Sequence, residues 1–341
     1  MARTACTSLG KGPQMLETRP APVEAAGAVT TWSAKDLLDT DTLSIAEIEL
    51  IMETAEAMRE IRQRPVARVA TLRGSTVVTL FYEQSTRTRA SFEVAAKALG
   101  ADVVNLTASG SSVEKGESLI DTVRTLEAIG ADVVVMRHAK SGAPYLAARN
   151  TKASVINGGD GTHAHPTQAL LDLFTMRRHI GDLAGKRVVI VGDVLHSRVA
   201  RSNVWSLMAS GASVVLCGPA TLVPRTLHGR AERGSCEVTT NLDAALEDAD
   251  VVMALRMQKE RQDGGLIPSL REYINGYQIN AKRLALARPG ALVMHPGPMN
   301  EGIEIAPEIA HGVTSVIEEQ VSNGVAVRMA VLYLMTTARR P

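Results

Sequence analysis

The 341-residue sequence has few aromatic residues and no excess of charge of either sign. Phe, Trp and Tyr make up 3% of it, which argues against a surface that stacks on the bases of single-stranded nucleic acid. Lys and Arg number 37 against 36 Asp and Glu, so the net charge of +1 gives no general attraction to nucleic acid or to an anionic membrane. Any cationic site must therefore be local.

Cysteine, long apolar runs and glycine-rich fingerprints are also scarce. Cys6, Cys217 and Cys236 are odd in number and lack metal-ligand spacing, so neither a disulfide framework nor a zinc site is expected. No apolar run reaches the roughly 18 residues of a membrane span, and the N-terminus lacks the apolar core of a signal peptide. No Gly-x-Gly-x-x-Gly follows the apolar run 188–193, which disfavours a dinucleotide site. We therefore expect a cytoplasmic protein that binds neither nucleic acid nor membrane.

Apolar residues are abundant, at 45% of the chain, and the length favours two domains. Residues 1–31 contain three prolines and no sustained apolar period, which predicts a flexible N-terminal extension. The glycine-bounded segment 181–185 is expected to join the two domains.

From residue 32 onwards, short apolar runs alternate with segments of helical periodicity. Strands are expected at 76–82, 101–106, 131–136, 154–157, 186–193, 213–217, 250–255 and 291–295. Helices are expected at 34–64, 88–99, 117–130, 142–150, 166–178, 198–210, 222–233, 241–248 and 315–338, the first with a capping box formed by Ser44 and Glu47. Strands that are apolar throughout are typical of parallel sheets covered on both faces. We predict an α/β fold of two tandem doubly wound domains, each a mainly parallel sheet flanked by helices, with the active site in the interdomain cleft.

The segment Ser85-Thr86-Arg87-Thr88-Arg89 stands between a predicted strand and a predicted helix. A helix N-terminus offers backbone N–H groups and the positive end of the helix dipole, and the hydroxyl and guanidinium groups add further donors. The alternative is a capped helix with exposed arginines, which the density of donors on one turn disfavours. The segment therefore predicts a site for a phosphate-sized anion.

Together with His165-Pro166-Thr167-Gln168, this motif resembles the aspartate/ornithine carbamoyltransferase family, and the resemblance extends over residues 33–339. It implies that the phosphate of carbamoyl phosphate is held by Ser85, Thr86, Arg87 and Thr88. It also implies that Arg137 contacts the carbamoyl oxygen and the phosphate, and that His165 and Gln168 complete the carbamoyl pocket. A backbone carbonyl at Gly297 or Pro298 is implied to accept from a substrate nitrogen, although relatives often have Leu or Ala where this chain has Gly297.

Two arginines that follow predicted strands in the second half of the chain bear on which amino acid accepts the carbamoyl group. A dicarboxylate needs two cationic partners, and arginine is suited to bidentate pairing. The stretches around Arg198 and Arg256-Met257-Gln258 resemble the aspartate branch of the family, whereas the ornithine branch usually carries a cysteine that is absent from the stretch 295–298 here. The resemblance assigns aspartate binding to Lys115, Arg137, Arg198, Arg256 and Gln258. Surface ion pairs are the alternative for Arg198 and Arg256.

The resemblance further implies an assembly. Related enzymes are trimers, so Ser111 and Lys115 on the loop 109–117 are expected to enter the neighbouring subunit's cleft, and Glu83 is expected to bridge the domains by pairing with Arg198 and Arg261. It divides the chain into a carbamoyl-phosphate-binding domain, 32–180 joined by the C-terminal helix 315–341, and an aspartate-binding domain, 181–314. Some relatives are free trimers and others associate with regulatory chains or dihydroorotase; no motif decides among these.

The implied reaction is transfer of the carbamoyl group from carbamoyl phosphate to the amine of L-aspartate, which gives N-carbamoyl-L-aspartate and phosphate in de novo pyrimidine biosynthesis. Catalysis would rest on positioning and electrostatics, with no metal or other cofactor. The resemblance makes Arg87, Thr88, Arg137, His165 and Gln168 the catalytic residues. An ornithine or other amino-acid carbamoyltransferase and a non-catalytic scaffold remain as alternatives.

Overall fold

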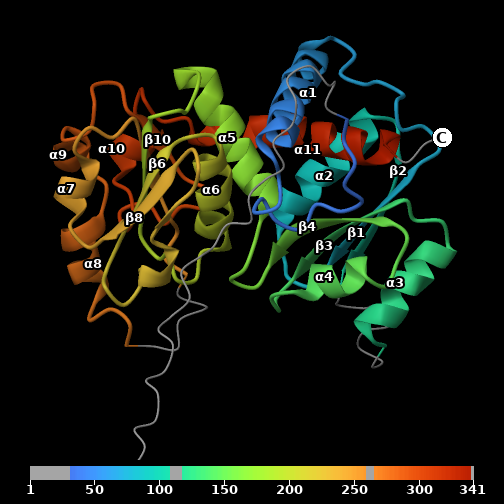
Figure 1. Ribbon diagram of the computed structural model, residues 1–341, viewed down its shortest axis with the longest axis horizontal. Helices are drawn as coiled ribbons and strands as arrows, with labels where there is room; N and C mark the ends of the chain where they lie inside the picture. Colours follow the sequence, from blue (N-terminus) through green and yellow to red (C-terminus); the bar gives the residue numbers. More distant parts are fainter. Residues whose placement is uncertain (1–30, 108–116, 259–264, 339–341) are drawn as a thin grey trace, which may run out of the picture.

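The computed structural model describes residues 31–107, 117–258 and 265–338. It forms two lobes, each built around its own sheet (Figure 1). The strands of the first lobe are β1 (Thr76–Phe81), β2 (Asp102–Thr107), β3 (Val133–His138) and β4 (Ser154–Asp160). Its helices are α1 (Ile45–Gln63), α2 (Thr86–Ala98), α3 (Leu119–Ala128), α4 (Ala143–Ala148) and α5 (Pro166–Ile180).

The second lobe contains the larger sheet. The C-terminal helix follows this lobe in the chain and extends back to the first lobe. Its strands are β5 (Arg187–Val191), β6 (Ser213–Cys217), β7 (Gly229–Arg230), β8 (Ser235–Thr239), β9 (Val251–Ala254) and β10 (Leu292–Met294). The helical segments are α6 (Arg198–Ala209), the short 3-10 turn η2 (Arg225–Leu227), α7 (Leu242–Leu246), α8 (Leu270–Tyr277), α9 (Ala281–Leu284), α10 (Pro307–Ala310) and α11 (Ile317–Thr337).

The first sheet has the order β2-β1-β3-β4 and the second β10-β9-β5-β6-β8-β7. Every strand pair within the described ranges is parallel except β7 with β8. Helices cover both sheets, and the central strand β1 buries five of its six residues. The predicted α/β fold of two mainly parallel sheets is confirmed.

The capping box places the start of α1. Ser44 N donates to Glu47 Oε2 at 2.9 Å and Glu47 N donates to Ser44 Oγ at 3.2 Å. The helix predicted over 34–64 therefore begins only at Ile45. The residues before it run alongside β4, where Leu37 exchanges backbone hydrogen bonds with Val155 and Asn157 at 2.9 Å.

The helix predicted over 222–233 was wrong. The segment forms η2 and then β7, which pairs antiparallel with β8. Gly234 explains part of this path, because a Cβ there would lie 2.6–2.7 Å from the carbonyl oxygens of Met208 and Ala212. Such close backbone packing beside β6 overrides a local helical pattern. β8, α8, α9 and α10 were not predicted either.

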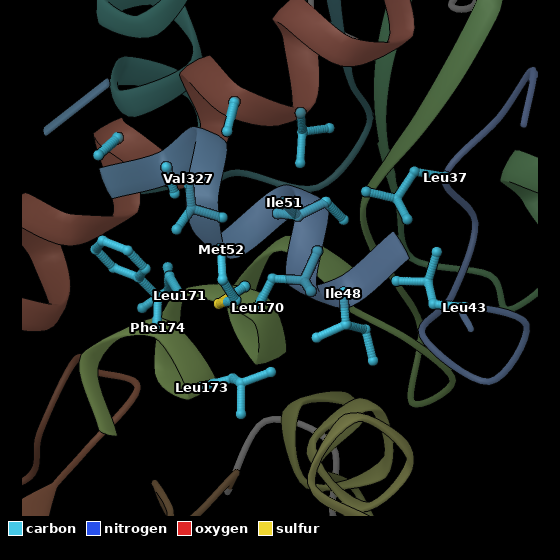
Figure 2. Packing of buried hydrophobic residues seen from close by; sticks show 14 of the residues in the cluster. Leu37, Leu43, Ile48, Ile51, Met52, Leu170, Leu171, Leu173, Phe174 and Val327 are labelled. Atoms are coloured by element: carbon cyan, nitrogen blue, oxygen red, sulfur yellow. The ribbon is translucent and has the colours of Figure 1, made fainter. Parts of the chain in front are cut away.

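Helix α11 returns from the second lobe and packs against α1, α2 and α5 (Figure 1). Figure 2 shows the apolar core where these helices meet: Ile51 and Met52 of α1 lie beside Leu170 and Phe174 of α5, with Val327 of α11 above them. Burying such side chains stabilises the fold by about 1.5–3 kcal/mol each. The chain passes between the lobes at α5 and again at α11, and the shared apolar core packs these two helices together. In the described ranges, no helix has the length and hydropathy needed to cross a bilayer.

Candidate active site

Loops from both sheets meet where the strand order of each sheet reverses. The chain passes from β1 to β2 on one side and to β3 on the other, and likewise from β5 to β6 and to β9. Ligands of doubly wound sheets bind outside the carboxyl ends of the strands at such reversals. Segment 83–88 follows β1, Arg137 is the penultimate residue of β3, Arg198 follows β5 and Arg256 follows β9. All of them line one cleft of about 730 Å³.

The cleft is strongly cationic although the chain is nearly neutral. Its described lining contains one carboxylate, Glu83, and five arginines: Arg87, Arg137, Arg198, Arg256 and Arg328. Converging cations in a partly closed, low-dielectric cleft favour anionic ligands. The cleft is therefore locally cationic, although the net charge of the whole chain is only +1.

The N-terminus of α2 forms one end of the cleft. Ser85 is its N-cap, and the Ser85 hydroxyl accepts from Thr88 N at 3.4 Å. Ser85, Thr86, Arg87 and Thr88 all line the cleft. Burial, and then the charge of Arg256, lower the pKa of the Arg87 guanidinium. Two cations held this close at a helix N-terminus form a site for an anion.

Glu83 joins the two lobes. Its Oε1 accepts from Arg137 Nη2 at 2.5 Å and from Arg198 Nη2 at 2.6 Å, and its Oε2 accepts from Arg198 Nη1 at 3.1 Å. Both arginines also donate to backbone carbonyls of the first lobe, Arg137 to Gly158 and Arg198 to Gly161. Charge-assisted bonds of this kind fix the guanidinium planes over the cleft.

His165 caps the start of α5 and is fully buried. Its backbone N donates to Ser202 Oγ at 3.0 Å, while no hydrogen-bond partner for Nδ1 is found among the described residues. Burial, with the nearby charges of Arg137, Arg198 and Arg328, holds the pKa of the imidazole well below its usual range. A neutral imidazole therefore faces the arginines, and Gln168 lines the cleft one turn later.

The loop after β10 closes the cleft opposite Arg87. Gly297 has φ +60°, and a Cβ on it would overlap the Arg87 guanidinium, so only glycine leaves that space to the arginine. The loop is held from within: Gly297 N donates to His295 Nδ1 at 2.8 Å, and His295 Nε2 lies 3.2 Å from Glu304 Oε1. The Gly297–Pro298 peptide bond is cis.

Most of the residues predicted for the site are gathered here. The cleft lining includes Glu83, the segment 85–88, Arg137, His165, Gln168, Arg198, Arg256, Gln258, Gly297 and Pro298. Ser111, Lys115 and Arg261 lie outside the described residues. Within the described part, no group of three or more His, Cys, Asp or Glu is arranged to hold a metal ion.

Sequence reasoning missed His295, Gln320 and Arg328, which also line the cleft. Gln320 and Arg328 lie on α11 and are buried there, as is Asn323.

Comparison with known families covers nearly the whole described chain. Residues 35–178 match the family described as "Aspartate/ornithine carbamoyltransferase, carbamoyl-P binding domain". Residues 184–335 match "Aspartate/ornithine carbamoyltransferase, Asp/Orn binding domain".

The chain is also similar to individual proteins. The aspartate carbamoyltransferase catalytic subunit of Roseiflexus sp. (strain RS-1) is 61% identical over 302 residues, which cover 89% of this chain and 95% of the relative. That of Dehalococcoides mccartyi (strain CBDB1) is 52% identical over 335 residues, or 98% of this chain and 99% of the relative.

Solved structures of both branches resemble this fold. Aspartate transcarbamoylase from Trypanosoma cruzi in complex with carbamoyl aspartate and phosphate has a TM-score of 0.78 at 29% identity and covers 87% of this chain and 94% of its own. Ornithine carbamoyltransferase from Pyrococcus furiosus has a TM-score of 0.80 at 29% identity, with coverages of 90% and 98%. The fold alone therefore does not separate the two acceptors.

Proposed function

Because the chain belongs to the aspartate/ornithine carbamoyltransferase family, we propose that it transfers the carbamoyl group from carbamoyl phosphate to the amine of L-aspartate, as an early step of pyrimidine synthesis. The products are N-carbamoyl-L-aspartate and phosphate. The relatives that share 52–61% of its sequence carry the name of the aspartate enzyme.

The positive charge of the cleft is the observation that favours aspartate over ornithine as the carbamoyl acceptor. L-Aspartate brings two carboxylates, and Arg198 and Arg256 follow the two strands at which the second sheet reverses. The side-chain ammonium of ornithine would need an acidic partner instead. Glu83 is the one acid in the described lining, and Arg137 and Arg198 already engage it.

In the proposed reaction the amine nitrogen attacks the carbamoyl carbon, a C–N bond forms, and the C–O bond to phosphate breaks. The N-terminus of α2 and Arg87 bind the phosphate, while Arg137 and His165 stabilise negative charge on the carbamoyl oxygen. The lowered pKa makes the His165 imidazole a weak base, so in this proposal its ring N–H serves as a donor. The aspartate amine attacks in its neutral form, and the departing phosphate takes the proton that the nitrogen loses as the C–N bond forms.

The proposal includes an assembly and a division of labour. Residues 32–180, with the C-terminal helix 315–341, bind carbamoyl phosphate, and residues 181–314 bind aspartate; the packing of α11 on α1, α2 and α5 supports this division. A homotrimer in the cytoplasm supplies Ser111 and Lys115 from a neighbouring subunit, and Arg261 joins Glu83 on closure. Gln258 and the loop carbonyls at Gly297 and Pro298 complete the substrate contacts.

Turnover of carbamoyl phosphate with L-aspartate, and separately with L-ornithine, tests the proposal when ureido product and phosphate are both followed. Product with aspartate alone is expected, together with competitive inhibition by succinate, a dicarboxylate without the amine. Arg256→Met is expected to raise KM for aspartate and to leave that for carbamoyl phosphate much less affected. Product with ornithine alone, or no product with either, would contradict the proposal.

A further inference from the structure

Asp172 lies on α5, one turn beyond Gln168, and is fully buried behind the cleft. Its carboxylate accepts three side-chain amides from three helices. Oδ1 accepts from Gln168 Nε2 of α5 at 3.0 Å and from Gln320 Nε2 of α11 at 2.7 Å, and Oδ2 accepts from Asn203 Nδ2 of α6 at 2.9 Å.

Burying the Asp172 carboxylate is energetically unfavourable. No Lys or Arg of the described ranges lies within ion-pairing distance of Asp172, and burial raises its pKa to about 6. The charge of Arg328 and the three amide donors only partly offset this. A buried charge held by neutral amides costs stability that an apolar side chain of similar size would not. Stability therefore does not account for an acid at this position.

An ionised carboxylate accepts hydrogen bonds and cannot donate them, so it fixes which end of each amide faces it. Gln320 turns its nitrogen to Asp172, and its Oε1 accepts from His295 N at 3.0 Å. Asp172 thereby also orients the start of the loop that contains Gly297 and Pro298. Gln168 likewise turns its nitrogen to Asp172, so its Oε1 is at the opposite end of the amide.

We propose that Asp172 is a positioning residue that sets the hydrogen-bonding polarity of the carbamoyl pocket, so that Gln168 and the loop after β10 present oxygen acceptors to the carbamoyl NH2 group. The inference rests on the proposed carbamoyl transfer. It makes the site selective for carbamoyl phosphate over acyl phosphates of the same shape, because a methyl group in place of the NH2 leaves these acceptors unsatisfied.

The test compares carbamoyl phosphate with acetyl phosphate, which replaces the NH2 by a methyl group. The readout is the ratio of the inhibition constant of acetyl phosphate to KM of carbamoyl phosphate. In Asp172→Asn the new carboxamide can donate as well as accept, so Gln168 pairs with it through either end. We expect KM of carbamoyl phosphate to rise, the inhibition constant of acetyl phosphate to stay nearly unchanged, and the ratio to fall about five- to ten-fold.

Thr175→Val is the matched control. Thr175 is a buried polar residue on the same helix. It accepts from Asn323 Nδ2 of α11 at 3.0 Å and donates to Leu171 O at 2.8 Å, but it is not among the described residues that line the cleft. The control is expected to lower stability and to leave the ratio unchanged. Gln320→Leu, which removes the bond to His295 N, is expected to lower the ratio and decides the question if Asp172→Asn does not fold.

Turnover by the unmodified enzyme with aspartate is measured first, since its absence would contradict the proposed function itself. With normal wild-type turnover, an unchanged ratio in folded Asp172→Asn would overturn the role of Asp172. An equal fall of the ratio in Thr175→Val would overturn it as well, because the effect would then follow from any loss of packing between α5 and α11.

Discussion

Glu83 and Arg198 form a two-point ion pair between the lobes, with Arg198 Nη2 2.6 Å from Oε1 and Nη1 3.1 Å from Oε2 of the carboxylate. Glu83 follows β1 of the first sheet, whereas Arg198 is the first residue of α6 after β5 of the second. The N-cap Ser197, whose hydroxyl accepts from Ala200 N, holds that helix start at the cleft. The pair therefore couples the distance between the lobes to the orientation of an arginine that we assign to substrate.

Replacing the Glu83 carboxylate should lower catalytic activity more than it lowers the stability of the fold. In Glu83→Gln the amide no longer neutralises Arg137 and Arg198, and it cannot accept from both of them at two points. Loss of a partner from a largely buried charge pair costs about 2–3 kcal/mol, so kcat/KM for aspartate should fall about 30- to 160-fold.

Glu93→Gln is the control for this change, because Glu93 pairs with Lys97 on the exposed face of α2 at 2.6 Å. Its activity should stay within about two-fold of wild type, since exposed pairs contribute little. Steady-state kinetics of both variants decide the matter, and equal activities would contradict a role for Glu83.

Gly159 should be sensitive to the smallest side chain. It has φ +114°, and a Cβ on it would lie 2.9 Å from Arg198 Nε and 3.0 Å from Arg137 Nη1. Gly159→Ala should therefore lower stability by about 1–2 kcal/mol through backbone strain and also displace both arginines. We expect kcat/KM to fall at least about ten-fold.

Gly130→Ala separates these two effects. Gly130 has φ +94°, but a Cβ on it would meet nothing within 4 Å. This variant should show the loss of stability in thermal unfolding and keep wild-type activity. If the two alanine variants were equally active, the overlap with the arginines would be without consequence.

Most strands, though not β7 and β8, and the motif-bearing turns were predictable because their signals are local. Val77 and Val78 belong to an apolar run too short for a helix, and Ser44 marks a helix start through its capping box with Glu47. Parallel topology then places the carboxyl ends of such strands together. Local signals thus led to the fold and to the anion site at residues 85–88, whereas most other cleft residues were assigned from the family resemblance.

What the sequence did not reveal depends on contacts between distant segments. Asp172 and Gln320 are 148 residues apart in sequence and meet only because α5 packs on α11. His295 and Glu304 pair inside a loop that has no periodicity. The segment 222–233 failed for the same reason, since its pairing with β8 outweighed its local pattern. Buried polar contacts of this kind carry no local signature.

The pH dependence of catalysis should not include His165. Burial and three nearby arginines hold the pKa of this imidazole well below its usual range, so the imidazole is neutral at pH 7. His165→Asn should lower kcat/KM and leave the apparent pKa values of the kcat/KM profile unchanged. Loss of one limb of the profile in this variant would mean that His165 titrates during catalysis and serves as acid or base.

The last prediction concerns Asp172 and stability. Its pKa is about 6 in the folded protein, above the value of about 3.9 in an unfolded chain, so the folded state binds the proton more tightly. The free energy of unfolding contributed by Asp172 is therefore highest below pH 4 and is lost as the pH rises through 6. Two pKa units correspond to about 3 kcal/mol.

Asp172→Asn removes this titration, so the stability of the variant relative to wild type should improve by about 2–3 kcal/mol between pH 4 and pH 7. Urea unfolding of both proteins at a series of pH values, at one protein concentration, measures the difference. The free energy of unfolding of Thr175→Val should differ from that of wild type by an amount that does not vary with pH, because neither threonine nor valine titrates. A constant difference for Asp172→Asn as well would mean that the carboxylate keeps an ordinary pKa, and that the amides of Gln168, Gln320 and Asn203 fully offset its burial.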